Sequence, residues 1–179
     1  GGKAWLQYQE QQSMAASNLY AQLSNAVSQG EAAAATSVHE TLLNEYSGSS
    51  YAVMAALQIA RLQLDQDNPE AARAQLQWAY DRAGNGPLKH TARLRLVRVL
   101  IAGDELDQAA ALLTEATERG SYAVIYHELE GDLAMAREDY AAAHTAYEAA
   151  LQAYPDDLPG RSLLEAKRDD AARVEGEAA

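Results

Sequence analysis

The feature that most constrains this chain is a triplet of small and apolar residues that recurs three times with the same internal spacing. Positions i, i+4 and i+7 lie on one face of an α-helix, so each triplet predicts one packed helix face. Successive triplets begin 37 and 34 residues apart. The three triplets are Ala72-Leu76-Ala79, Ala109-Leu113-Ala116 and Ala143-Tyr147-Ala150.

A small or β-branched residue also recurs on the segment before each triplet, as Ala60, Val97 and Gly131. Small residues let two antiparallel helices approach closely, and a period of this length is typical of tetratricopeptide repeats. Residues 130–155 preserve the pattern best, because Tyr147 can fill the gap beside Gly131 and Pro155 ends the second helix. We therefore expect stacked helical hairpins.

Composition supports the same fold class. The chain has 39 alanines among 179 residues, only four prolines, and no sustained alternation of the kind that strands require. Alanine at this density favours helices and close helix contacts. We predict an all-α, tetratricopeptide-like solenoid of about nine helices, with a long N-terminal helix and a C-terminal capping helix.

We expect one domain over residues 1–179. The first hairpin is interpreted as degenerate, because His39 and Leu42 do not match the triplet cleanly after Ala35, and terminal repeats commonly deviate. Asn68 and Asp104 are predicted to cap the helices that follow them. The predicted parts are an N-terminal helix in residues 1–30, a degenerate hairpin in 31–50, repeats in 51–86, 87–120 and 121–155, a capping helix in 161–175 and a frayed tail in 176–179.

The sequence offers no catalytic constellation. Its four histidines, His39, His90, His127 and His144, show no metal-ligand spacing, and we expect them to face solvent or to be hydrogen-bonded. The paired acids Glu138-Asp139 and Asp156-Asp157 are interpreted as helix caps. We predict no enzyme activity, no cofactor and no metal site.

The net charge of the chain disfavours some classes of binding partner. A net charge of −12 disfavours nucleic acids and anionic membrane surfaces. The absence of cysteine excludes disulfides and thiol chemistry but leaves the compartment open.

Basic residues are concentrated in one segment of this acidic chain, at Lys89, Arg93, Arg95 and Arg98, but they do not form a single stripe on one helix face. They are interpreted either as a binding site or, alternatively, as partners in ion pairs with Asp104, Glu105 and Glu115. Trp5 and Tyr8 are either ordinary packing residues or an aromatic anchor at a membrane interface.

The first helix of each hairpin is expected to line the inner wall of the solenoid. Arg61, Arg98 and Asp132 fall at equivalent positions, so the wall runs from basic to acidic, which suits a peptide segment. For Leu57 and Leu94, a place in the core between helices is an equal alternative. The predicted partner-binding residues are Met54, Leu57, Arg61, Leu64, Thr91, Leu94, Arg98, Ile101, Ile125, Glu128, Asp132 and Met135.

The chain also resembles a known family. The resemblance rests on Ala74-Gln75-Leu76-Gln77-Trp78-Ala79, on Leu88-Lys89, on residues 92–100 (ARLRLVRVL) and on residues 164–170 (LEAKRDD). In order and spacing these segments are similar to the YfgM family of Gram-negative bacteria, and the similarity extends over most of the chain.

The resemblance implies an inner-membrane protein with one membrane span upstream of Gly1 and a periplasmic tetratricopeptide-like domain. Family members are ancillary subunits of the SecYEG translocon and partners of the chaperone PpiD, and they help to pass translocated polypeptides to periplasmic chaperones. Under this resemblance Trp5 becomes an interfacial residue. The resemblance supplies no catalytic residue.

Two functions follow as hypotheses. The first is a non-enzymatic periplasmic interaction domain that binds a PpiD-type chaperone, the translocon or a translocated polypeptide along the inner wall. The alternative is a structural scaffold that pairs with a second copy of itself through its long first helix and the apolar side of its last helix, at Leu163, Leu164 and Val174.

Overall fold

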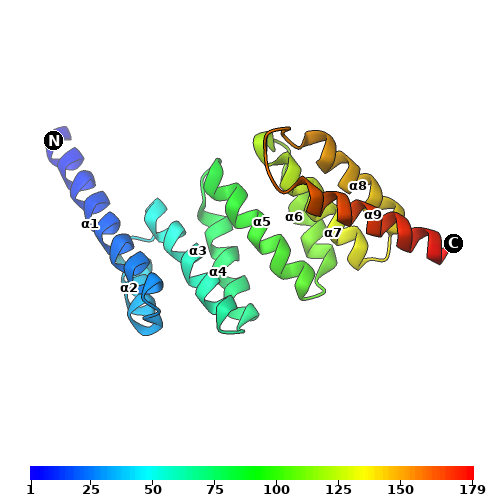
Figure 1. The fold of residues 1–179 in the computed structure, drawn as a ribbon. Helices are drawn as coiled ribbons and strands as arrows, with labels where there is room; N and C mark the ends of the chain where they lie inside the picture. The colour runs from blue at the N-terminus through cyan, green and yellow to red at the C-terminus, as the bar shows by residue number, and fades with distance from the viewer. The chain divides into compact units, whose positions relative to one another are not determined.

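The computed structural model describes residues 1–179 and consists of helices and connecting turns, without a strand (Figure 1). The predictions of an all-α chain, of about nine helices, and of a long first helix and a C-terminal helix are confirmed. The elements are α1 (Gly2–Ser28), α2 (Ala32–Glu45), α3 (Ser50–Asp65), α4 (Pro69–Arg82), α5 (Pro87–Ala102), α6 (Leu106–Glu115), the 3-10 helix η1 (Gly120–Tyr122), α7 (Ala123–Ala136), α8 (Tyr140–Ala153) and α9 (Arg161–Ala178).

The chain forms two compact units, Gly1–Ala92 and Arg93–Ala179, and α5 begins in the first and continues into the second. The single domain predicted over residues 1–179 stays a prediction. The last helix extends to Ala178, three residues beyond the predicted end at 175.

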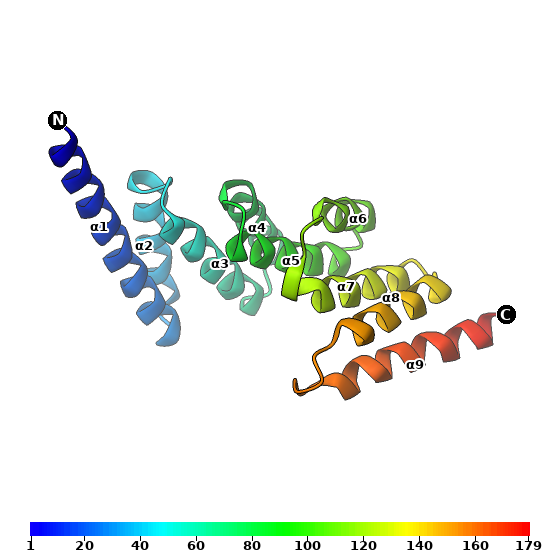
Figure 2. The same cartoon turned by 90° about the horizontal axis from the view of Figure 1, so that it is seen from above.

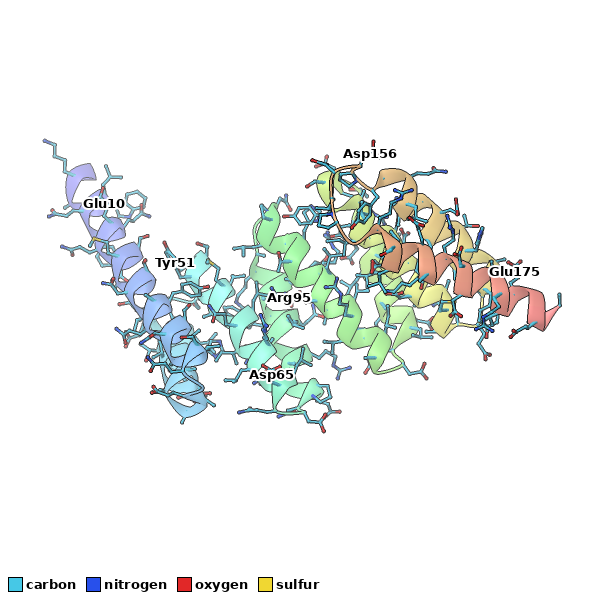
Figure 3. The ribbon with its side chains drawn as sticks, viewed as in Figure 1. Glu10, Tyr51, Asp65, Arg95, Asp156 and Glu175 are labelled. Carbon is cyan, nitrogen blue, oxygen red and sulfur yellow. The ribbon has the colours of Figure 1, made fainter.

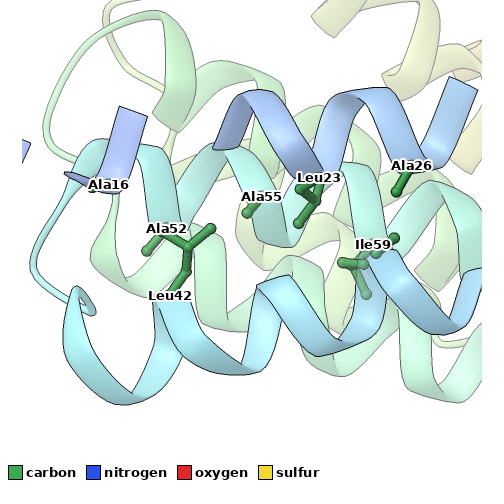
Figure 4. Close-up of a cluster of buried hydrophobic side chains, with 8 residues drawn as sticks. Ala16, Leu23, Ala26, Leu42, Ala52, Ala55 and Ile59 are labelled. Carbon is green, nitrogen blue, oxygen red and sulfur yellow. The ribbon is translucent and has the colours of Figure 1, made fainter. Parts of the chain in front are cut away.

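In the first unit, α1 packs on both α2 and α3, and α3 pairs with α4. Five of the eight residues in the central cluster are alanines, so the helix backbones approach closely around a few larger side chains. Figure 4 shows Leu23, Leu42 and Ile59 supplying those larger side chains. The cluster comprises Ala16, Leu23, Ala26, Ala35, Leu42, Ala52, Ala55 and Ile59.

In the second unit, α7 pairs with α8, and α9 lies along α8 (Figures 1 and 2). Gly131 of α7 is buried against Tyr147 of α8, as the sequence predicted for the closure of this hairpin. The cluster here comprises Ala134, Ala143, Tyr147, Ala150, Leu151, Leu164 and Ala171.

The triplets that define the repeat are buried in every copy, with exposed fractions of 6% or less. Ala35, His39 and Leu42 have the same spacing, start 37 residues before Ala72, and are equally buried, at 0%, 3% and 0%. The first pair therefore keeps the register and departs from the pattern in the chemistry of His39.

The turn inside each hairpin also repeats. A residue with left-handed backbone, at φ between 58° and 73°, precedes the N-cap of the second helix in all four hairpins: Gly30, Asp67, Asp104 and Glu138. This geometry ends the preceding helix and starts the next one within two residues.

The structure confirms some of the predicted helix caps and contradicts others. Asn68 and Asp139 accept hydrogen bonds from the backbone N–H groups of Ala71 and Ala142, which confirms both caps. The prediction for Asp104 is wrong, because its left-handed backbone closes α5 and the next residue, Glu105, is the N-cap of α6. The prediction for Asp156 and Asp157 is also wrong, because Gly160 is the N-cap of α9.

Candidate partner-binding surfaces

Five predicted wall residues lie in the first unit. Arg61 and Leu64 are exposed on α3, while Met54 is half-buried. Leu57 is 5% exposed, so its alternative role as a core residue holds. Thr91 is half-buried at the start of α5, where its hydroxyl donates to the backbone oxygen of Pro87 at 3.0 Å.

The other wall residues lie in the second unit. Leu94 is 4% exposed and is also a core residue, whereas Arg98 is exposed and Ile101 is half-buried on the same helix. On α7, Ile125 is 36% exposed and Met135 is half-buried beside the cluster that α8 and α9 share. That the twelve residues form one wall stays a prediction.

The acidic end of the predicted wall is occupied by the chain itself. The Lys167 Nζ of α9 lies 3.3 Å from the Glu128 Oε1 and 3.0 and 3.2 Å from the two carboxylate oxygens of Asp132. The Tyr147 hydroxyl donates to Asp132 Oδ1 at 2.7 Å. Two carboxylates of α7, one tyrosine of α8 and one lysine of α9 thus form one polar cluster.

Burial and the neighbouring carboxylates shift the pKa values of Tyr147 and Lys167. Burial raises the pKa of the Tyr147 hydroxyl above its ordinary value, and its hydrogen bond to Asp132 raises it further. Burial alone would lower the pKa of Lys167, but the hydrogen bond and charge of Asp132 and the charge of Glu128 outweigh it and raise the pKa. Lys167 is therefore charged at neutral pH.

Two further polar contacts and two buried apolar residues hold α9. The Arg168 Nη1 lies 3.1 Å from the Glu148 Oε1 of α8, and the Arg161 Nη1 donates to the backbone oxygen of Leu151 at 3.0 Å. Leu164 and Ala171 provide the buried apolar contacts, at 3% and 0% exposure. Lys167 was not predicted as a site residue, and only its position on one face with Leu164 and Ala171 signals its role.

The basic concentration on α5 makes contacts with tyrosines. The Lys89 Nζ donates to the backbone oxygen of Tyr80 at 2.5 Å and lies 4.0 Å from the centre of that ring. Arg93 is buried at 7% exposure, and its Nη1 donates to the Tyr126 hydroxyl at 2.9 Å. These two cations therefore bind groups within their own units.

The histidines lie in different environments, one buried and another beside a charged group. His39 is 3% exposed and its Nε2 has no hydrogen-bond partner, so the prediction of a solvent-facing or hydrogen-bonded histidine is wrong here. Burial lowers the pKa of His39, against a smaller opposing effect of the Glu40 charge. The His127 Nδ1 lies 3.0 Å from the Glu130 Oε1. No three histidine or acidic residues converge as metal ligands would.

Arg119 is a structural residue that the sequence patterns did not single out. It follows α6, and its guanidinium donates to the backbone oxygens of Ala116 and Leu113 at 3.0 and 3.1 Å. Its Nη1 also lies 2.7 Å from Glu130 of α7. A single side chain therefore satisfies the end of α6 and links it to the next helix.

The first half of α1 projects without a packed partner in its unit. Trp5, Leu6, Tyr8 and Met14 are 56–65% exposed, so the interpretation of Trp5 and Tyr8 as ordinary packing residues is wrong; Glu10 marks this half in Figure 3. A groove of about 590 Å³ lies between this half of α1 and the turn from α2 to α3. Its lining residues are Tyr8, Gln9, Gln12, Ser13, Glu45, Tyr46, Ser47, Gly48, Ser49, Ser50 and Tyr51.

Comparison with known proteins decides the family. The tetratricopeptide repeat-like domain family matches residues 1–173. Proteins named ancillary SecYEG translocon subunit are similar to this chain in Haemophilus influenzae (30% identity; 85% of this chain and 74% of the relative) and in Escherichia coli (29%; 85% and 72%). The chain belongs to the YfgM family, which has a tetratricopeptide-like fold.

A YfgM relative with the same name in Neisseria gonorrhoeae is 30% identical over 72% of this chain, which spans 61% of that relative's length. No solved structure matches the chain. The match to the repeat-like domain confirms the tetratricopeptide-like fold class of this YfgM chain. No helix in it combines the length and the apolar character that crossing a membrane requires.

Proposed function

We propose that this chain is a non-enzymatic interaction domain of an inner-membrane-anchored periplasmic protein at the SecYEG translocon, where it assists the handover of translocated polypeptides. A PpiD-type chaperone and the emerging polypeptide are its proposed partners. The names of its relatives and its tetratricopeptide-like fold support a role in protein binding.

One observation carries the proposal for where binding occurs. The second helix of each hairpin buries its triplet, whereas the first helices leave Arg61 and Arg98 exposed at equivalent positions of successive repeats. Exposed cations on a scaffold of buried alanines serve no packing purpose. They suit the acidic or carbonyl-rich surface of a polypeptide partner.

The test reverses both charges. Arg61→Glu combined with Arg98→Glu should weaken site-specific crosslinking to a PpiD-type partner and to SecYEG several-fold, while the helical circular dichroism spectrum persists. The matched control combines Lys3→Glu with Arg82→Glu, which changes the net charge equally at two exposed positions outside the predicted wall and away from α9. Equal crosslinking by both double variants would remove the wall from the mechanism.

The alternative function is a homo-oligomeric scaffold, and the exposed apolar residues of α1 favour it. Trp5, Leu6 and Met14 are at least 56% exposed, and Leu163 of α9 is 67% exposed. Exposed apolar surface promotes association. Analytical ultracentrifugation that finds only monomers at high micromolar concentration would contradict this alternative.

A further inference from the structure

The last helix buries few of its own residues and adds polar contacts to them. Of the 18 residues of α9, only Leu164 and Ala171 are buried, whereas α7 and α8, with 14 residues each, bury five and four. The lysine and arginine contacts that complete the docking involve side chains that are about one-quarter to two-fifths exposed. Ion pairs this exposed are weak and are screened by salt. The attachment of α9 therefore depends on these charge contacts as well as on Leu164 and Ala171.

The surface beneath α9 has an apolar floor and an acidic rim. The floor consists of Tyr147, Ala150 and Leu151 of α8, which pack with Leu164 and Ala171 in one cluster. The rim consists of Glu128 and Asp132 of α7 and Glu148 of α8, each of which α9 meets with a cation. A helix that docks here must present an apolar residue flanked by basic ones.

The sequence of α9 carries this combination of apolar and basic residues on one face. Leu164, Lys167, Arg168 and Ala171 stand at i, i+3, i+4 and i+7, so they share one face of the helix. Leu163, on another side, is 67% exposed and contributes nothing to the docking. The recognition pattern is thus Leu-x-x-Lys-Arg-x-x-Ala on a helix.

We propose that the α7–α8 face under α9 is a binding surface for a partner helix with an apolar and basic face of this pattern, and that α9 is its intramolecular competitor. Charge complementarity selects such a partner, because the rim is acidic and the whole chain carries a net charge of −12. The seven residues that connect α8 to α9 (154–160) lie mostly at the surface, so few contacts of the connection itself hold α9 in place.

This inference rests on the proposed function in one respect, that the chain has a polypeptide partner. It refines the predicted wall, because Glu128 and Asp132 are 32% and 28% exposed but already paired with Lys167, and a partner's cation can take its place only when Lys167 releases them. It also distinguishes the α7–α8 face from the exposed cations Arg61 and Arg98, which need no such release.

The first test asks whether α9 is released when its charge contacts weaken. In the full chain, Lys167→Gln should speed hydrogen exchange of the α9 amides at least ten-fold and leave α7 and α8 protected, and 0.5 M NaCl should act similarly on the unaltered chain. Leu163→Ala, an exposed substitution on the same helix, is the matched control and should change nothing. Unchanged α9 exchange in Lys167→Gln would overturn the proposal.

The second test supplies the partner helix as a labelled peptide. The probe is the peptide of residues 160–178 with Asp169→Gln and Asp170→Gln, which keeps the docking face and removes the acids that pair with Arg168 and Arg173. Fluorescence anisotropy should show it binding the Lys167→Gln chain at least ten-fold more tightly than the unaltered chain. The control peptide carries Lys167→Glu and Arg168→Glu, and should not bind.

The outcomes separate this surface from the proposed function. Equal binding of probe and control peptides, or no binding of either, would overturn the surface even if crosslinking to the translocon persists. Conversely, specific peptide binding with no crosslinking to the translocon would leave the surface standing and contradict the proposed function. Dimers of the unaltered chain that the double substitution Lys167→Glu and Arg168→Glu dissociates would make α9 of a second copy the occupant, and would overturn the assignment to a separate partner.

Discussion

Gly131 of α7 and Tyr147 of α8 stand so close that no side chain fits between them. A Cβ at residue 131 would lie within 3.0 Å of three carbons of the Tyr147 ring. The ring cannot withdraw easily, because its hydroxyl is bound to Asp132 and its face is buried in the hairpin. This contact sets the distance between the two helices of the best-preserved repeat.

We therefore predict that Gly131→Ala lowers the free energy of unfolding by about 1–3 kcal/mol, the usual cost of overpacking a core. Urea titration followed by circular dichroism measures it. Gly176→Ala, in the open C-terminal part of α9, meets no atom within 4 Å and should be neutral or slightly stabilising. A Gly131→Ala chain as stable as the Gly176→Ala chain would show that the Tyr147 ring moves aside at little cost and that the contact does not constrain the hairpin.

His39 makes the first unit sensitive to acid. Burial holds the pKa of His39 below its ordinary value, so the unfolded chain binds a proton more readily than the folded chain. Stability is unaffected well above the unfolded pKa of about 6.5, and should fall by up to roughly 1.4 kcal/mol per pH unit between that value and the lowered pKa. His39→Leu should remove this dependence, as measured by urea unfolding at pH 7.5 and pH 5.0.

The same variant should also stabilise the chain at neutral pH. Leucine occupies the equivalent triplet position at Leu76 and Leu113, and it would replace a buried nitrogen that has no partner, a group that costs about 1–3 kcal/mol. His39→Gln separates the two effects, because it abolishes the titration and keeps a polar group in the core. If His39→Gln retains the acid sensitivity, the titrating group is not His39.

Local spacing explains what the sequence could predict. The triplets, the helix order, and the caps at Asn68 and Asp139 depend on residues within one or two helical turns, and residue spacing determines which of them share a face. The burial of His39 was also accessible in principle, since Ala35, His39 and Leu42 repeat the triplet spacing. It was missed because a histidine was not expected in the place of a leucine.

Contacts between distant residues could not be predicted in this way. Lys167 and Asp132 are 35 residues apart and Arg93 and Tyr126 are 33 apart, so each pair meets only through tertiary packing. The spacing placed Asp132 correctly on the first helix of its hairpin, but could not reveal that α9 covers it. Asp104 was misassigned because an acid before a helix suits both an N-cap and a left-handed turn residue.

The repeated left-handed turn offers a stabilising substitution. Only the first hairpin uses glycine in this position, and the others hold Asp67, Asp104 and Glu138 at φ values of 58° to 59°. Such a backbone strains residues with a Cβ by roughly 1–2 kcal/mol. Glu138→Gly should therefore raise the free energy of unfolding by about 0.5–1 kcal/mol, after the entropy that glycine adds to the unfolded chain.

Thermal and urea unfolding of Glu138→Gly give the measurement. Ala136→Gly, two residues earlier at the end of α7, introduces the same flexibility where the backbone is helical, and should destabilise by about 0.5–1 kcal/mol. Destabilisation of similar size by both substitutions would mean that the left-handed geometry at Glu138 carries no strain.

The buried hydrogen bond between Arg93 and Tyr126 should contribute strongly to the stability of the second unit. Tyr126 is fully buried, and its hydroxyl accepts from the Arg93 guanidinium at 2.9 Å. Removing the acceptor beside a buried cation costs about 1.5–3 kcal/mol. Tyr126→Phe should lower the free energy of unfolding by that amount in urea titration, although its ring stays in place 4.9 Å from the Arg119 guanidinium.

The control is Tyr8→Phe, which removes a hydroxyl from a ring that is 59% exposed and should change the free energy of unfolding by no more than about 0.5 kcal/mol. A comparably small change in Tyr126→Phe would show that another group takes over the hydrogen bond from Arg93.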